Sequence, residues 1–158
     1  MLKKDALSAL SASKQIFVTN RTLGADPSYC LPVRTVTDRA LTALFTDNMF
    51  RPVPEDGNES VFHNAPFLLV ALPYTKLDSA KYIDRLRIDP TTGKTSDMAV
   101  VMDFEERVGL IFGSAYLGTV KKLMFTVMNY LSTDHGILPL HCAANEGPKS
   151  VNLLLGLS

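Results

Sequence analysis

The sequence has little cysteine, and this shortage excludes two kinds of site. Cys30 and Cys142 are its only cysteines, and neither belongs to a CxxC pair. We therefore expect no disulfide framework and no thiolate zinc site. Reduced thiols are typical of the cytoplasm, which is the compartment that we predict.

The sequence also has no excess of either charge and no long apolar run. Its 16 basic residues balance 16 acidic residues, so the net charge is zero. Nucleic-acid and anionic-membrane binding both need clustered positive charge, and we expect neither partner. No segment approaches the roughly 20 apolar residues of a membrane helix. The basic N-terminus lacks the apolar run of a secretory signal. The pattern favours no particular oligomeric state.

What is present suits a globular domain or a large piece of one. The chain has 158 residues, of which 46% are hydrophobic, enough for a core. Elements of both kinds are expected from periodicity and turn residues. Helices are expected over residues 1–10, 37–49, 77–86 and 116–131. Strands are expected over residues 15–19, 31–36, 67–72, 98–104, 107–112, 137–142 and 151–155. This alternation predicts an α/β fold with a mixed α+β sheet that is largely buried.

Two segments invite comparison with a phosphate-binding loop. Gly93-Lys94-Thr95 matches the end of a Walker A motif, but Ile88 occupies the position of its first glycine. Neither the strand nor the helix of such a loop flanks it, so we predict an ordinary turn that binds no nucleotide. The apolar strand over residues 151–155 runs directly into Gly156. A phosphate-binding loop begins in this way, although many other strands also end in glycine.

The third candidate site lies on the expected helix over residues 116–131. This helix is apolar almost all round and is expected to be mostly buried, yet Lys121 and Lys122 interrupt it. The two side chains are about 100° apart around the axis. One lysine can extend to solvent. Alternatively, burial disfavours an ammonium and leaves a neutral amine that can ligate a metal. His141 is open to two interpretations, a core residue or a ligand.

Read in order, three segments resemble the ATP-dependent phosphoenolpyruvate carboxykinase family. Residues 113–131 are similar to the family pattern G-T-x-Y-x-G-E-x-K-K-G-x-F-x-x-M-N-Y-x. Residues 136–145 are similar to G-I-x-x-x-H-C-S-A-N, and residues 155–158 to the start of G-L-S-G-T-G-K-T. A weaker resemblance covers much of the chain upstream. It implies part of a carboxykinase N-terminal domain over residues 1–135 and the first strands of a P-loop nucleotide domain over residues 136–158.

The resemblance also implies a reaction and its site. The family converts oxaloacetate and ATP to phosphoenolpyruvate, CO2 and ADP, with Mn²⁺ in the active site and Mg²⁺ on the nucleotide. By position in the motifs, Lys122 and His141 resemble the Mn²⁺ ligands. Tyr116 resembles the tyrosine near the carboxylate or CO2 of the substrate. A metal would stabilise charge as decarboxylation proceeds, and phosphoryl transfer would depend on positioning and charge neutralisation.

Gly156, Leu157 and Ser158 resemble the beginning of the loop that holds the ATP phosphates. The sequence departs from the family pattern at Thr119 and Leu123, where glutamate and glycine are usual. The rest of the Walker loop, the family's aspartate ligand and its nucleotide-binding arginines are not in the chain. We therefore expect this chain alone to be inactive. The alternatives are a non-catalytic binding module on the same scaffold and another P-loop phosphotransferase.

Overall fold

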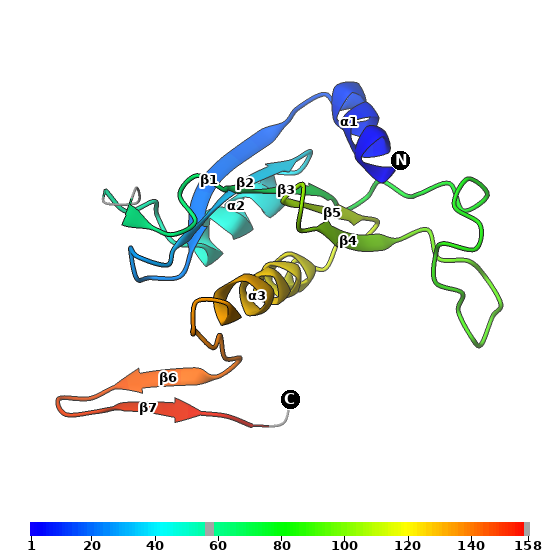
Figure 1. Cartoon of the computed structure of the whole chain (residues 1–158). Helices are drawn as coiled ribbons and strands as arrows, with labels where there is room; N and C mark the ends of the chain where they lie inside the picture. Colours follow the sequence, from blue (N-terminus) through cyan, green and yellow to red (C-terminus); the bar gives the residue numbers. More distant parts are fainter. Residues whose placement is uncertain (56–58, 157–158) are drawn as a thin grey trace.

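The computed structural model describes residues 1–55 and 59–156, and a five-stranded mixed sheet lies at its centre (Figure 1). Its strands are β1 (Phe17–Leu23), β2 (Leu31–Thr37), β3 (Phe67–Leu72), β4 (Ala99–Asp103) and β5 (Val108–Phe112), in the order β1-β2-β3-β5-β4. The inner strands β2, β3 and β5 are parallel. The outer strands β1 and β4 pair antiparallel with their neighbours. The prediction of a mixed α/β sheet is confirmed.

Helices cover both faces of the sheet because its central strands are apolar on both sides. The helices are α1 (Leu2–Ala12), α2 (Ala40–Met49) and α3 (Gly118–Thr133). Leu69 of β3 packs in one buried cluster with Leu123 of α3. Val70, the next residue of β3, packs in a second cluster with Leu10 of α1. Successive side chains of a strand point to opposite faces, so α1 and α3 lie on opposite sides of the sheet. In the part of the chain described, no helix is long and apolar enough to cross a bilayer.

A glycine in β5 lets α3 lie close to the sheet. A Cβ atom built on Gly109 would lie 2.8 Å from Cδ2 of Leu123 and 3.4 Å from Cδ1 of Leu69. A larger residue would therefore require the Leu123 side chain to move. The missing side chain at Gly109 thus allows close packing between β5 and the helix that carries Lys121 and Lys122.

The helix predicted over residues 77–86 is absent, and that prediction is wrong. The segment consists of turns in which only Leu77 and Tyr82 are buried. The Asp78 side chain accepts a hydrogen bond from the N–H of Ala80, and Asp84 has a φ of 64°. Asp side chains that bond to the nearby backbone favour turns over helix, and the left-handed Asp84 interrupts any helical run.

The strand predicted over residues 137–142 is also wrong. That segment is irregular, and Pro139, which has no N–H to donate, lies in its middle. The chain enters a strand only at β6 (Ala143–Glu146), which pairs antiparallel with β7 (Val151–Leu154) in a separate two-stranded sheet. Every residue of β6 and β7 is exposed. Figure 1 shows this hairpin beyond the end of α3.

Candidate active site

A glycine at the start of α3 positions the candidate tyrosine. The chain turns before the helix, and the N–H of Thr119 donates to the carbonyl of Tyr116 at 2.9 Å. The hydroxyls of Ser114 and Thr119 lie 2.7 Å apart. A Cβ atom on Gly118 would lie 2.3 Å from Cζ of Tyr116. The phenol ring therefore occupies the space that a side chain at position 118 would take, and Gly118 is part of the site's support.

Helix α3 is buried along one face only, which corrects the expectation of a mostly buried helix. Its buried residues are Val120, Leu123, Met124, Val127 and Ser132. Lys121 and Lys122 are both exposed. Lys122 Nζ lies 5.6 Å from the centroid of the Tyr116 ring, within the range of a cation–π contact. The structure thus favours the solvent-facing interpretation for both lysines and brings Lys122 to Tyr116.

His141 lies in the irregular segment between α3 and β6, and not on a strand as predicted. Its side chain is exposed, so it is not a core residue. Its Nε2 atom lies 3.3 Å from Nζ of Lys121, and its ring lies 5.7 Å from the ring of Phe125. Lys121 is therefore the lysine that contacts the imidazole. Lys121 and Phe125 are four residues apart, so they share a helix face, but no signal in the sequence pairs that face with His141, because an irregular segment places the histidine.

The two residues predicted to ligate a metal both carry nitrogen donors. Within residues 1–55 and 59–156, no group of three or more His, Cys, Asp or Glu side chains could hold an ion. Lys122 and His141 would supply two nitrogens. Cys142, next to the histidine, is a free thiol, as is the buried Cys30. Lys122 and His141 remain the proposed ligand pair.

The predicted phosphate-loop residues are only partly visible. Gly156 follows β7, and no atom lies within 4 Å of a Cβ built on it. Leu157 and Ser158 lie outside the described residues. Of the three predicted cofactor-binding residues, Gly156 alone has a described position, in open space after the strand.

The segment around Gly93 is a turn, as predicted. The Asp89 carboxylate accepts hydrogen bonds from the N–H groups of Thr92 and Thr91, each at 2.8 Å. These bonds hold the pKa of Asp89 below its usual value. Gly93 has a φ of 67°, and its N–H donates to the Asp89 carbonyl. The turn is thus closed on its own aspartate, and the absence of nucleotide binding there stays a prediction.

The fold and site together define the class of protein: an α/β protein in which one helix carries two exposed lysines, one beside Tyr116 and the other beside His141. The phosphoenolpyruvate carboxykinase family model matches residues 1–158. The chain belongs to the phosphoenolpyruvate carboxykinase family.

Relatives from several bacteria carry the ATP-dependent form of that name. Phosphoenolpyruvate carboxykinase (ATP) of Bacillus cytotoxicus is 37% identical over 99% of this chain and 28% of its own length. The Geobacillus kaustophilus enzyme of the same name is 36% identical over 99% of this chain and 28% of its length. Phosphoenolpyruvate carboxykinase (ATP) 1 of Moorella thermoacetica is 36% identical over 96% of this chain and 27% of its length. The chain spans little more than a quarter of these relatives.

Proposed function

We propose that this chain is a segment of an ATP-dependent phosphoenolpyruvate carboxykinase, the enzyme that converts oxaloacetate and ATP to phosphoenolpyruvate, CO2 and ADP in gluconeogenesis. The observation that carries the proposal is the family match over all 158 residues. Because the chain spans 28% of the Bacillus cytotoxicus relative, we expect the segment alone to be inactive. The complete enzyme would act in the cytoplasm and use Mn²⁺, with Mg²⁺ on its ATP.

The proposed division places part of an N-terminal domain in residues 1–135 and the start of the nucleotide domain in residues 136–158. Two observations support it. The β6–β7 hairpin shares no strand pairing with the five-stranded sheet. Its residues are exposed, as expected of strands whose packing partners lie elsewhere in a longer protein. Gly156, Leu157 and Ser158 would begin the loop around the ATP phosphates.

The exposed side of α3 would hold the substrate. Tyr116 would donate a hydrogen bond to a carboxylate of oxaloacetate or to CO2, with the Lys122 ammonium or amine beside its ring. Lys122 and His141 would hold Mn²⁺. When bound, the ion would supply Lewis-acid stabilisation of developing negative charge. Lys121 now occupies the Nε2 side of His141 at 3.3 Å, so ligation through that nitrogen would require the Lys121 side chain to withdraw.

A chimera tests the proposed function. The matching segment of the Bacillus cytotoxicus relative is replaced by residues 1–158 of this chain, and formation of phosphoenolpyruvate is measured with oxaloacetate and ATP. We expect turnover by the chimera and none by the isolated segment. The chimera with His141→Ala should fold and lose activity. A folded chimera without activity, or an active one with His141→Ala, would count against the proposal.

The adjacent lysines allow a matched test of the metal ligands. In the chimera, Lys122→Ala and His141→Ala should each weaken Mn²⁺ binding by on the order of tenfold or more. Loss of a residue that only orients a metal ligand already costs that much, and loss of the ligand itself should cost at least as much. Lys122→Arg should not restore binding, since a guanidinium stays protonated. Lys121→Ala removes the amine that contacts His141 and should leave Mn²⁺ affinity unchanged or higher. The measurement is electron paramagnetic resonance of free Mn²⁺.

Two results would contradict this ligand assignment. One is that Lys121→Ala lowers Mn²⁺ affinity as much as Lys122→Ala. The other is that Lys122→Ala and Lys122→Arg both bind Mn²⁺ like the unsubstituted chimera. In the isolated 158-residue chain, we expect weak Mn²⁺ binding, because two nitrogen donors leave the ion mostly hydrated.

A further inference from the structure

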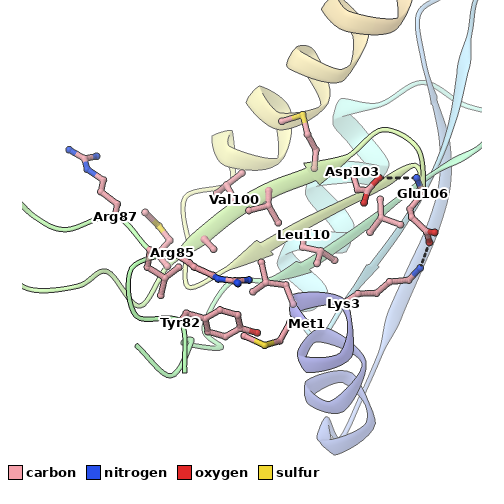
Figure 2. Close-up of a pocket in the computed structure, with 16 residues that line it drawn as sticks. Met1, Lys3, Tyr82, Arg85, Arg87, Val100, Asp103, Glu106 and Leu110 are labelled. Atoms are coloured by element: carbon pink, nitrogen blue, oxygen red, sulfur yellow. Dashed lines mark hydrogen bonds and ion pairs between the residues drawn. The ribbon is translucent and has the colours of Figure 1, made fainter. Parts of the chain in front are cut away.

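A groove that shares no residue with the candidate active site opens beside the edge of the sheet. It has a volume of about 530 Å³ and lies between the first turn of α1, the segment around Tyr82–Arg87 and strand β4 (Figure 2). Small-molecule sites in proteins commonly measure about 300–1,000 Å³. Neither Tyr116, Lys122 nor His141 lines the groove. Any ligand here would therefore occupy a second site.

The floor of the groove is apolar because α1 does not reach across the edge strand. Val108 and Leu110 of β5 are buried, and they belong to the cluster that α1 covers. Val101 of β4, which pairs with Leu110 on the same face, is only partly buried at the margin of that cluster. Leu2 forms part of the wall. Covering apolar surface that is left open in this way favours binding of an apolar chain.

Three basic side chains line the groove, Lys3, Arg85 and Arg87, and the backbone of Arg85 is held by a buried tyrosine. Tyr82 is 3% exposed, and its hydroxyl donates to the Asp5 carboxylate at 2.5 Å. The N–H of Arg85 donates to the carbonyl of Tyr82 at 3.0 Å across a turn. Figure 2 shows the Arg85 guanidinium between Tyr82 and the sheet. Arg85 takes part in none of the ion pairs found within residues 1–55 and 59–156.

The acidic residues of the groove lie away from Arg85 and already have partners. Glu106 pairs with Lys3 at 2.7 Å, and the Asp103 carboxylate accepts the N–H of Glu106 at 2.9 Å. Figure 2 shows these three residues together at the end opposite Tyr82. Within the part of the chain described, the groove therefore offers Arg85 outside any ion pair at one end, an apolar floor, and at the other end two carboxylates of which Lys3 neutralises one.

We propose that this groove binds a medium-chain monocarboxylate. The carboxylate lies on the Arg85 guanidinium, whose planar fork suits two parallel hydrogen bonds to carboxylate oxygens. The alkyl chain runs along Val101 and Leu110 and covers the apolar floor. The charge fixes the direction of the ligand, because its carboxylate is repelled by the acidic end and attracted to the arginine end.

The test is calorimetric titration of octanoate into the 158-residue chain, with Arg87 as the matched control. Arg87 also lines the groove's rim, but Figure 2 shows its side chain pointing away. We expect saturable one-site binding that Arg85→Gln weakens on the order of tenfold, since charged hydrogen bonds contribute about 1.5–3 kcal/mol. Arg87→Gln should bind octanoate like the unsubstituted chain. Octanol should bind at least tenfold more weakly than octanoate. Both arginines are exposed, so neither substitution is expected to unfold the chain.

Nuclear magnetic resonance places the ligand. Octanoate should change the methyl chemical shifts of Val101 and Leu110 by more than those of Val33, which lies in the other buried cluster. The proposal is overturned if no saturable binding occurs, if both arginine variants weaken it equally, or if octanol binds as well as octanoate. It is also overturned if sedimentation shows the groove filled by a second copy of the chain in a dimer that octanoate does not dissociate.

Discussion

Gly118 shows how one missing side chain shapes the candidate site. The Tyr116 ring lies where a Cβ at position 118 would be, with 2.3 Å between Cζ and that atom. Gly118→Ala should therefore displace the ring and separate it from Lys122, which now lies 5.6 Å from the ring centroid. Stability should change by less than about 1 kcal/mol, because Tyr116 is 65% exposed and alanine favours helix by up to that amount. Loss of the nuclear Overhauser effect between ring and lysine methylenes is the expected signal.

Tyr116→Phe is the control for that experiment, because it keeps the ring and removes only the hydroxyl. It should retain the contact with the Lys122 methylenes. An unchanged Overhauser effect in Gly118→Ala would mean that the ring is not displaced and that Gly118 does not position it.

Residue identities in the site follow from the sequence more readily than their contacts do. The family motifs single out Tyr116, Lys122 and His141, but the pattern alone does not say which of two adjacent lysines meets the histidine. That depends on where the irregular segment after α3 places His141, and it lies beside Lys121. A helical spacing predicts which residues share a face. It does not predict which residue of a neighbouring loop contacts that face.

At the scale of elements, α1 is joined to the turns before β4 by one carboxylate. Asp5 accepts hydrogen bonds from Lys81 and from the Tyr82 hydroxyl. These bonds, that from Lys81 first, hold the pKa of Asp5 below its ordinary value. Burial, followed by the bond to Asp5, raises the pKa of Tyr82 to about 12. Both shifts couple the docking of α1 to pH.

The signs of the two shifts predict losses of stability at both extremes. A lowered carboxyl pKa stabilises the fold above the unfolded value of about 3.9, and this is lost as pH falls through the folded value. A raised tyrosine pKa stabilises the fold below about pH 10, and this is lost as pH rises toward about 12. The free energy of unfolding, measured with urea across pH, should fall at both ends.

Two variants separate the contributions. Asp5→Asn should reduce the fall in the free energy of unfolding at acid pH. The reduction should be partial, because the pKa of Asp97 is also lowered, chiefly by its hydrogen bond with Lys76. Tyr82→Phe should flatten the alkaline limb between about pH 10 and about 12. If both variants keep the pH profile of the unsubstituted chain, the Asp5 contacts do not contribute to its stability.

Elements with a strong pattern were predictable, and those without one were not. The apolar run of β3 and the long helix α3 were predicted to within a few residues, because a buried strand or helix must be apolar wherever it meets the core. Residues 77–86 and 137–142 contain enough apolar residues to suggest a helix and a strand. Local turn chemistry at Asp78 and Asp84, and the missing donor at Pro139, decided those segments instead.

For the whole molecule, alternation of helices and strands predicted the mixed sheet, since apolar central strands need cover on both faces. The exposure of β6 and β7 was less predictable. Val151, Leu153 and Leu154 form an apolar strand in the sequence, yet all three are exposed. An apolar pattern indicates that a segment is buried in the complete protein, and this chain spans 28% of its Bacillus cytotoxicus relative.

Hydrogen exchange should divide the chain at this hairpin. No residue of β6 or β7 belongs to either buried cluster, and a lone two-stranded hairpin is marginally stable in water. Its amides should therefore exchange by local opening far faster than those of β3 and β5, which open only with the core. In the chimera, the same amides should gain protection, because the remaining nucleotide domain would cover the hairpin. Protection of β6 and β7 equal to that of β3 in the isolated chain would contradict the proposed boundary between residues 135 and 136.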